Sequence, residues 1–297
     1  MPRRTICIQN RAKLSVKAGS LVVSQEGRET PVPLEDIWVV ILETHQAVIT
    51  SAALSALVSA GIGVMTCGSD HMPNGLTLPI GAHSRHAAIV ENQLAISKPL
   101  KKQLWRRIVV QKIANQAAAL DLLGKDGSAV RRHGGAAVLS DDSSGREDVA
   151  AAAYFKLLLP EGTRRDGPYA PALDYGYGVL RAAIGRVAVA GGWLVSRGLH
   201  HHSDLNAFNL VDDLIEPFRA LVDLLVVANG LKGNLTHESK RALAGVFEYE
   251  MRVGGEGLGV QAAIEDVFDS LKAAVLENDA DRLRLPELVA LRRVQTE

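Results

Sequence analysis

The spacing of apolar residues changes along the chain. Up to about residue 80, apolar and β-branched residues form short runs separated by turn residues, a pattern that predicts strands. The predicted strands are residues 5–9, 12–18, 21–25, 38–44 and 62–67. Between the last two, Thr50 or Ser51 can cap a short helix that Gly61 ends. The first part of the chain therefore predicts a mostly β domain.

After Pro79 the pattern becomes helical and strand-like runs largely cease. We therefore place a domain boundary near residue 80, with a β domain over residues 1–80 and an all-α domain over residues 81–297. This is an α+β fold class. The predicted helices lie within residues 92–120, 146–159, 171–197, 208–223, 236–252 and 260–278.

One stretch, Gly198–Arg219, combines three histidines with a helix that carries carboxylates. At helical spacing the apolar residues fall on one side, and the opposite arc holds Asn209, Asp212, Asp213, Glu216, Arg219 and Asp223. Glu216 can share one spot with Asp213 or with Asp212, because residues three and four apart are neighbours on a helix. Two close carboxylates repel unless a cation or a proton lies between them.

Two readings of this arc stay open from spacing alone. His200, His201 or His202 can add an imidazole to the carboxylates, giving a mixed nitrogen and oxygen ligand set. Alternatively, the acids form an ordinary solvated face paired with Arg219. Pro217 also predicts a bend, because it lacks an amide donor and leaves the carbonyl of Asp213 without its helical partner.

Composition narrows the class of protein. The 47% hydrophobic and 22% charged content is that of a folded globular protein rather than a disordered one. The chain has 33 lysines and arginines and 33 aspartates and glutamates, so its net charge does not indicate a nucleic-acid partner.

Cys7 and Cys67 are too few for a disulfide scaffold, which favours a reducing cytoplasm and buried, inert thiols. His45 and His71 have no acidic partner at ligand spacing, and we expect surface or packing roles. We find no membrane-spanning stretch.

Local charge is more informative than net charge. Residues 92–120 contain six lysines and arginines and no acid, among them Lys101, Lys102, Arg106 and Arg107. Trp105 and its apolar neighbours give this helix an inward face, so the basic side chains point outward, as on a surface for polyanions. An ordinary solvated helix has the same pattern. Arg164 and Arg165 lie in a later loop.

Several segments together resemble a known family. LDYGYGVL, then LHHHSDLNAFNLVDDLIEPFR, with REDVAAAAYF upstream and the N-terminal NRAKLSVKAGSLVV and LETHQAVIT, are similar to the CRISPR-associated spacer-acquisition integrases, most of all those of type II systems. The resemblance covers nearly the whole chain. It implies an N-terminal β domain and a C-terminal helical domain, in agreement with the boundary near residue 80.

The resemblance also implies a metal site. Family members bind a divalent metal through a glutamate, a histidine and an acid, which fall here on Glu147, His201 and Glu216, with Asp213 as an additional ligand or a supporting carboxylate. Asp148 follows Glu147 where the family often has glycine. Carboxylate oxygens with one imidazole and no thiolate favour Mg²⁺ or Mn²⁺. Such a metal can activate a DNA 3′-hydroxyl and stabilise charge in the transition state.

The implied reaction is transesterification, which joins captured DNA ends to a CRISPR repeat. The implied partners are spacer and repeat DNA, a second copy in a homodimer, a small ferredoxin-like CRISPR-associated protein and, for type II members, the RNA-guided interference nuclease. Lys101, Lys102, Arg106, Arg107, Arg164 and Arg165 then become candidate phosphate contacts. The alternatives are a metal-dependent nuclease of branched or single-stranded DNA, a non-catalytic DNA-binding scaffold and, more distantly, a small-molecule metal hydrolase.

Overall fold

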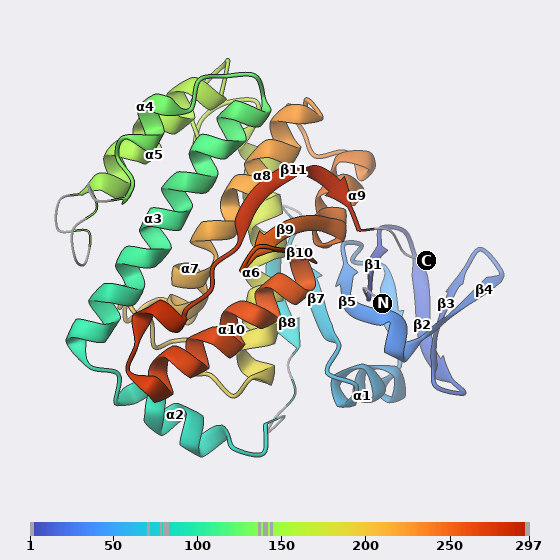
Figure 1. Cartoon of the computed structure of the whole chain (residues 1–297). Helices are drawn as coiled ribbons and strands as arrows, with labels where there is room; N and C mark the ends of the chain where they lie inside the picture. Colours follow the sequence, from blue (N-terminus) through green and yellow to red (C-terminus); the bar gives the residue numbers. More distant parts are fainter. Residues whose placement is uncertain are drawn as a thin grey trace.

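The computed structural model describes residues 3–69, 72–77, 79, 83–135, 138, 142 and 145–294. It shows a β-rich N-terminal part beside a larger, mainly helical part (Figure 1). His71 lies outside the described residues. None of the helices found in these ranges is long and apolar enough to cross a membrane.

The N-terminal part contains two four-stranded sheets. Its elements are β1 (Arg4–Ile8), β2 (Ala12–Lys17), β3 (Ser20–Gln25), β4 (Arg28–Pro33), β5 (Ile37–Leu42), β6 (Ala47–Ile49), α1 (Ser51–Ser59), β7 (Gly63–Cys67) and β8 (Pro73–Thr77). One sheet has the strand order β1-β5-β7-β8 and the other β4-β3-β2-β6. Thr50 caps α1 by accepting a hydrogen bond from the amide of Ala53. The five predicted strands and this helix are confirmed.

β5 contributes side chains to the hydrophobic clusters of both parts. Ile37 and Val40 belong to the smaller hydrophobic cluster inside the β-rich part, whereas Trp38 and Ile41 belong to the larger cluster of the helical part. The Trp38 ring packs edge-on against the ring of Phe247, with the ring centroids 4.8 Å apart. A strand buried on both faces reads as a continuous apolar run, which is what this segment shows.

A buried polar contact crosses the same boundary. Glu43 accepts a hydrogen bond from the Tyr175 hydroxyl and lies 3.3 Å from the ammonium of Lys240. Both charged side chains are almost fully buried. Burial raises the pKa of the neighbouring Cys7 thiol to about 12, and Glu43 adds to the effect, so this thiol stays protonated. Cys67 is buried as expected, and Cys7 is half-buried.

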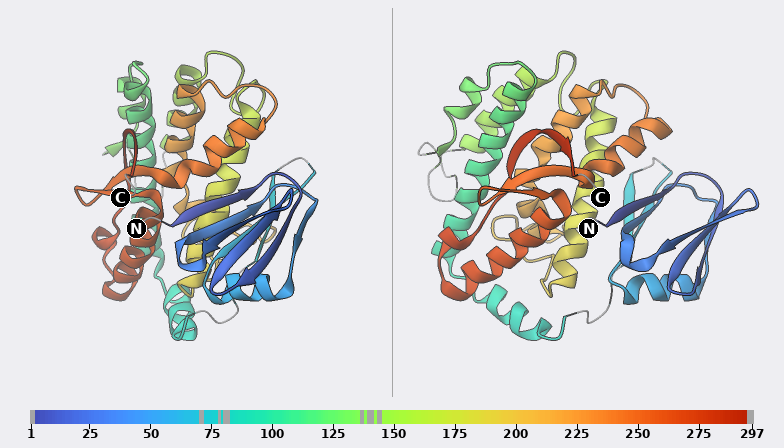
Figure 2. Two further views of the ribbon diagram at one scale, coloured as in Figure 1. Left: turned by 90° about the vertical axis from the view of Figure 1, so that its right-hand side faces the viewer. Right: turned by 45° about the vertical axis from the view of Figure 1, so that its right-hand side comes forward.

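The helical part is built around α3 and α8, which pack along each other (Figure 2). Its elements are α2 (His86–Leu94), α3 (Lys98–Leu122), α4 (Ser128–Arg131), α5 (Arg146–Leu158), α6 (Ala170–Ala190), α7 (Asn209–Leu214), α8 (Glu216–Ala228), α9 (His237–Ala244), β9 (Tyr249–Val253), β10 (Glu256–Gly259), α10 (Val260–Glu277) and β11 (Glu287–Arg293), with short 3₁₀ turns at residues 34–36, 245–248 and 280–282.

The expectation of an all-helical second domain is wrong near the C-terminus. β9, β10 and β11 form a three-stranded antiparallel sheet. The hairpin between β9 and β10 turns through Gly254 and Gly255, whose φ angles are +59° and +91°, a conformation that glycine adopts without strain. The predicted helix over residues 236–252 therefore ends at Ala244, because its last residues alternate polar and apolar as a strand does.

Two other predicted helices have different ends. α6 stops at Ala190 instead of Arg197, because Gly192 adopts a left-handed φ of +84°. The carboxylate helix is divided into α7 and α8 at Ile215, two residues before Pro217, so the predicted bend is confirmed. Both breaks shape the functional site, since they free the chain before His201 and set the position of Glu216.

Candidate functional site

The three histidines lie in an irregular segment between α6 and α7. Gln93, on α2, is buried and donates hydrogen bonds to the carbonyls of Leu194 (2.9 Å) and Arg197 (2.7 Å). Its side-chain oxygen accepts the amide of Leu194 at 2.9 Å. Asn209 is also buried and donates from Nδ2 to three carbonyls, those of Ser196, Ser203 and Asn206. The segment thus depends on side chains from elsewhere to satisfy its backbone.

Asp213 is the third buried group that holds this segment. Its side chain is fully buried, and its oxygens accept the amides of Leu199 (2.6 Å), His200 (3.1 Å) and His201 (3.1 Å). Oδ1 also lies 2.7 Å from Nδ1 of His201. These four donors occupy the acceptor positions of one carboxylate. Asp213 therefore points at the backbone of the histidine segment rather than at the cavity.

The structure distinguishes the three histidines. His201 lines the main cavity, and its contact with Asp213 leaves Nε2 as the ring nitrogen available to other groups. Hydrogen bonding to Asp213 raises the pKa of His201 although partial burial opposes this. His200 stacks on Trp105 with ring centroids 4.2 Å apart and an angle of 5°. His202 is exposed, and its Nδ1 lies 2.9 Å from the carbonyl of His200.

Glu147 and Glu216 meet at the ammonium of Lys112. Nζ lies 2.6 Å from Glu147 Oε1 and 2.6 Å from Glu216 Oε2. Burial lowers the pKa of Lys112, but the charges of Glu216 and Glu147 outweigh it and the net shift is upward. For Glu216, burial acts to raise the pKa, but the positive charges of Lys112 and Arg219 outweigh it and hold the pKa below its usual value. Two carboxylates distant in sequence thus share one cation.

Local structure places each of these glutamates. Glu147 lies in the first turn of α5, where Asp142 accepts the amides of Arg146 and Glu147, both at 2.9 Å. Glu216 is the first residue of α8, and its Oε1 accepts a hydrogen bond of 2.9 Å from Nε of Arg219. The alternative of an ordinary solvated face is wrong for Asp213 and Glu216, which are both buried, although the expected pairing of Glu216 with Arg219 is present.

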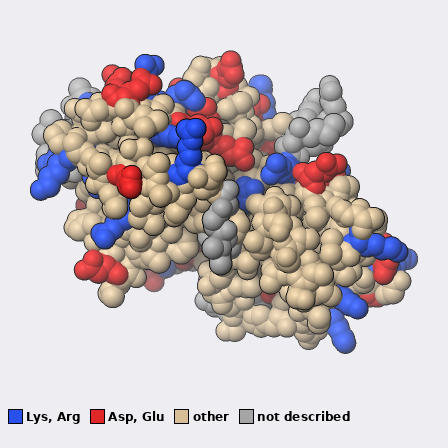
Figure 3. Space-filling model, turned by 90° about the horizontal axis from the view of Figure 1, so that it is seen from below, with Lys and Arg blue, Asp and Glu red and all other residues tan. Residues whose placement is uncertain are grey.

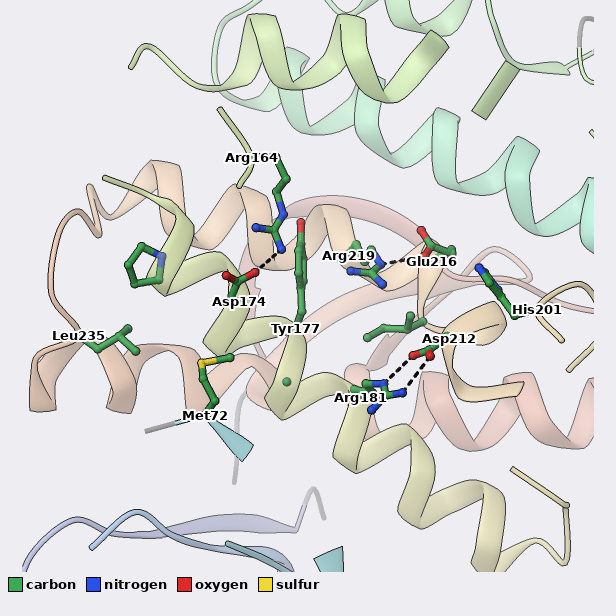
Figure 4. Close-up of a pocket in the computed structure, with 13 residues that line it drawn as sticks. Met72, Arg164, Asp174, Tyr177, Arg181, His201, Asp212, Glu216, Arg219 and Leu235 are labelled. Carbon is green, nitrogen blue, oxygen red and sulfur yellow. Dashed lines mark hydrogen bonds and ion pairs between the residues drawn. The ribbon is translucent and has the colours of Figure 1, made fainter. Parts of the chain in front are cut away.

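A cavity of about 680 Å³ opens beside His201 and Glu216 (Figure 4). Arg181 donates from Nε to one oxygen of Asp212 at 2.6 Å and from Nη2 to the other at 2.9 Å. Asp212 is therefore neutralised locally and does not share a cation with Glu216. No local spacing in the sequence predicts the pairing of Arg181 with Asp212, because the two residues lie on different helices.

Tyr177 separates two arginines in the same wall. The guanidinium carbons of Arg164 and Arg219 each lie 4.7 Å from the centre of the Tyr177 ring. Its hydroxyl donates to buried Asp223, which also accepts a hydrogen bond of 2.9 Å from Tyr154. Burial raises the pKa of Asp223 to about 6, although both tyrosine hydroxyls act against it. Asp223, expected on the polar arc, is instead fully buried.

The predicted phosphate contacts fall into different environments. Arg106 donates to the carbonyl of Val138 (2.7 Å), and Arg107 pairs with Asp281 (2.6 Å), so both guanidinium groups hold the protein together. Arg164 pairs with Asp174 at 2.6 Å. The remaining three are accessible: Lys101 and Arg165 each line a cavity beside the site, and Lys102 is exposed.

Charge is interspersed on the face that Figure 3 shows, where basic and acidic side chains alternate on a mainly uncharged surface. That face does not carry a continuous basic surface. Any polyanion contact there must therefore use single basic groups. His45, the other histidine that we expected to lack a site role, is exposed and hydrogen bonds through Nε2 to the carbonyl of Cys67 at 3.2 Å.

As the side chains stand, no three histidine, cysteine, aspartate or glutamate residues of the described part are close enough together to hold a metal ion. The donor types nevertheless suit a hard divalent cation, because carboxylate oxygens of Glu147 and Glu216 face one cation and His201 lines a cavity with Glu216. Glu216 Oε2 is buried and accepts no well-aligned hydrogen bond, although the Lys112 ammonium is at ion-pair distance. The position between the two glutamates is thus already that of a cation.

The chain is similar to known proteins in sequence and in fold. A family model described as "CRISPR associated protein Cas1" matches residues 6–247. The chain is 42% identical over its whole length to the full length of a protein named CRISPR-associated endonuclease Cas1 from Neisseria meningitidis serogroup C (strain 8013). It is 29% identical, over 84% of this chain and 92% of the relative, to CRISPR-associated endonuclease Cas1 2 of Pyrobaculum aerophilum.

Solved structures share the fold at low sequence identity. A casposase bound to its integration product superposes with a TM-score of 0.76 at 16% identity, covering 94% of this chain and 92% of that one. A Cas1 protein from Thermotoga maritima gives a TM-score of 0.70 at 16% identity, covering 92% and 97%. These matches confirm the α+β architecture with a β-rich N-terminal part and a mainly helical C-terminal part.

Proposed function

Because this chain belongs to the CRISPR-associated Cas1 family, as its sequence motifs predicted, we propose that it is a DNA integrase and endonuclease of spacer acquisition. In the proposed reaction the 3′-hydroxyl of captured DNA attacks a phosphodiester of a CRISPR repeat. One phosphorus–oxygen bond forms while another breaks, and the displaced repeat strand leaves with a free 3′-hydroxyl. The observation that carries this proposal is the meeting of Glu147 and Glu216 at one cation position, beside a cavity that His201 lines.

We propose Glu147, His201 and Glu216 as the residues that hold a divalent metal, Mg²⁺ or Mn²⁺. When bound, such a metal lowers the pKa of a hydroxyl and stabilises charge that develops on phosphate oxygens. The ammonium of Lys112 marks where a cation is stable between the two carboxylates, and it must move aside for the metal. His201 contributes Nε2, because Nδ1 faces Asp213.

Asp213 acts as a positioning residue in this proposal. Its four contacts are with the amides of residues 199–201 and with the His201 ring. Fixing the ring costs no reorganisation at the moment of reaction, which is the advantage of a site assembled before the substrate binds. Arg219 has a similar part for Glu216, since its hydrogen bond leaves the second carboxylate oxygen directed at Lys112.

Hydrolysis is the second candidate activity, because curated relatives carry the name endonuclease. The same site can attack a phosphodiester with water in place of a DNA hydroxyl. The two activities differ in their products, since integration creates new strand joints and hydrolysis only shortens strands. A non-catalytic DNA-binding scaffold would show neither product.

The proposed partners follow from the family. Among solved structures of similar fold are complexes titled Cas6-RT-Cas1–Cas2 and a Cas1–DNA complex. By analogy we propose that this chain binds spacer and repeat DNA, forms a homodimer and assembles with a small ferredoxin-like CRISPR-associated protein. Cooperation with an RNA-guided interference nuclease and a cytoplasmic location complete the proposal.

The proposal is tested by incubating purified protein, with and without the small partner protein, with short duplex DNA and a plasmid that carries repeats. We expect joined products with Mn²⁺ or Mg²⁺ and none with EDTA. Alanine in place of His201 or Glu216 should abolish joining, whereas His202→Ala, a matched change at an exposed neighbour, should retain it. Joining by His201→Ala at the wild-type rate would remove the assignment.

A further inference from the structure

His201 also lines a second, smaller cavity of about 320 Å³. Lys101 from the first turn of α3 and Arg197 from the histidine segment line it, together with Ser203, Asn206 and Asn209. We call it the Lys101–Arg197 cavity. Its size is that of the smallest ligand pockets, which suits one nucleotide and excludes a duplex.

The charges of this cavity differ from those around the main one. There, Arg164, Arg181 and Arg219 each pair with a carboxylate. Lys101 and Arg197 form no ion pair with any acid of the described residues, although Asp204 lines the same cavity. The two cations outnumber this one carboxylate, and a concave site that is lined by a net positive charge attracts an anion.

The wall of the cavity is built before any ligand arrives. Gln93 holds the backbone carbonyl of Arg197 at 2.7 Å, and Asn209 holds the carbonyls of Ser196 and Ser203 at 3.0 and 2.9 Å. Because Asn209 Nδ2 makes these bonds, its amide orientation is fixed. Asn209 Oδ1 is buried and accepts no hydrogen bond within the described residues. Its residue is only 3% exposed, so it is an acceptor in a preformed site with no partner of its own.

We propose that the Lys101–Arg197 cavity binds one nucleotide of a DNA strand next to the reacting phosphodiester, with the phosphate of that nucleotide against Lys101 and Arg197. This inference rests on the proposed function, because His201 joins the cavity to the site of reaction. Asn209 Oδ1 accepts a hydrogen bond from the nucleotide, either from a base amino group or from a terminal hydroxyl. The cavity thereby sets where along a strand the reaction takes place.

The nucleotide can come from the captured strand or from the repeat strand, and the test separates them. Binding of short DNA to the full-length protein is measured without divalent metal, so that no reaction occurs. Neutral methylphosphonate linkages replace single phosphates, one position at a time, in each strand in turn. Arg197→Ala is combined with each DNA in a double-mutant cycle, and Arg28→Ala, on exposed β4 of the β-rich part, is the matched control.

We expect one linkage at which methylphosphonate weakens wild-type binding about tenfold, the size of a lost charged contact, and has no further effect in Arg197→Ala. The strand that carries this linkage identifies the source of the nucleotide. Arg197→Ala should also reduce the salt dependence of binding by about one released ion, as Lys101→Ala should, while Arg28→Ala does not.

Full additivity at every linkage of both strands, with melting temperatures unchanged, would overturn the proposal. That outcome leaves the proposed function intact if the wild-type protein still joins DNA. Conversely, coupling at one linkage in a protein that joins no DNA would support the subsite and remove the function.

Discussion

Lys112 and Glu216 form an ion pair of 2.6 Å whose side chains are only 12% and 7% exposed, and Glu147 shares the same ammonium. A cation is therefore part of this structure even without a metal. Removing one member of a buried pair costs about 3–5 kcal/mol, because the remaining charge is left without compensation. The two glutamates consequently depend on either the ammonium or a divalent ion.

Replacing Lys112 with methionine tests this dependence. We expect Lys112→Met to be less stable than wild type in EDTA, by about 3–5 kcal/mol, and to recover most of that loss in Mn²⁺. The rise in melting temperature on adding Mn²⁺ should then be larger in the variant than in wild type, because the metal no longer displaces an ammonium. Lys98→Met, at the exposed start of the same helix, is the control. Equal Mn²⁺ effects in Lys112→Met and wild type would contradict this account.

Gln93 is expected to matter although it touches no proposed ligand. Gln93→Glu keeps the shape and the acceptor for the Leu194 amide but loses both donated hydrogen bonds. We expect a loss of about 2–4 kcal/mol in the free energy of unfolding, because the carbonyls of Leu194 and Arg197 lose the donors that hold them. Urea denaturation measures it, with Gln103→Glu on the exposed face of α3 as control.

If Gln93→Glu changes only the free energy of unfolding, Gln93 has a structural role and does not position His201. The positioning role predicts in addition that the NMR signal of the His201 ring shifts and that the turnover number for DNA joining falls more than the KM for DNA rises. Gln93→Asn, which keeps an amide with a shorter reach, should lie between wild type and Gln93→Glu.

Asp223 predicts a pH dependence of stability. Burial raises its pKa from 3.8 to about 6 in the folded state. Between about pH 4 and about pH 6, the folded protein thus keeps a proton on Asp223 that the unfolded chain has released. The contribution of Asp223 to stability is therefore fully present below about pH 4 and is lost as the pH rises through about 6. A shift of about two units corresponds to about 3 kcal/mol.

Asp223→Asn removes this titration and keeps one acceptor oxygen for a tyrosine hydroxyl, while its NH2 group can donate to the oxygen of the other tyrosine. The difference in unfolding free energy between variant and wild type should therefore move in favour of the variant as the pH rises from about 4 to about 7. Denaturant titrations at several pH values measure that difference. A difference that stays constant with pH would show that Asp223 does not titrate in this range.

The predicted phosphate contacts are now divided by their environments. Arg106→Ala and Arg107→Ala should lower stability, because each guanidinium group bonds within the protein, and should change DNA affinity little. Arg165→Ala should leave stability unchanged and weaken DNA binding. It should also reduce the salt dependence of DNA binding by about one ion. Fluorescence anisotropy at several salt concentrations, with melting temperatures for each variant, checks both halves. A larger salt effect from Arg106 than from Arg165 would contradict the division.

Much of the fold was accessible from the sequence because its signals are local. The strands of the N-terminal part alternate or run apolar, and Thr50 caps α1 as its side chain predicts. β9 was missed because residues 249–253 directly follow a helical pattern, and only the pairing with β10 and β11 distinguishes a strand from a final helical turn. The boundary near residue 80 stays a prediction, and β5 packs in both cores.

The site was less accessible, because its contacts join distant segments. Spacing placed Asp213 and Glu216 on one face, yet Asp213 turns to the amides of residues 199–201 and Glu216 to Lys112 on another helix. Position in the sequence suggested an imidazole from residues 200–202, but the role of Glu147 and the choice of His201 came from family resemblance alone. Lys112 was only one of six basic residues in its segment, and no local pattern marks a lysine that will be buried between two acids.

The central claim is that Glu147, His201 and Glu216 hold one divalent ion. Pulsed electron paramagnetic resonance of the protein with bound Mn²⁺ tests it most directly, since the nitrogen of a coordinated imidazole modulates the Mn²⁺ signal. We predict modulation from one histidine in wild type and in His202→Gln, its loss in His201→Gln, and weakened Mn²⁺ binding in Glu147→Gln and Glu216→Gln. Nitrogen modulation that persists unchanged in His201→Gln, or Mn²⁺ binding unaffected by both glutamate variants, would contradict the account.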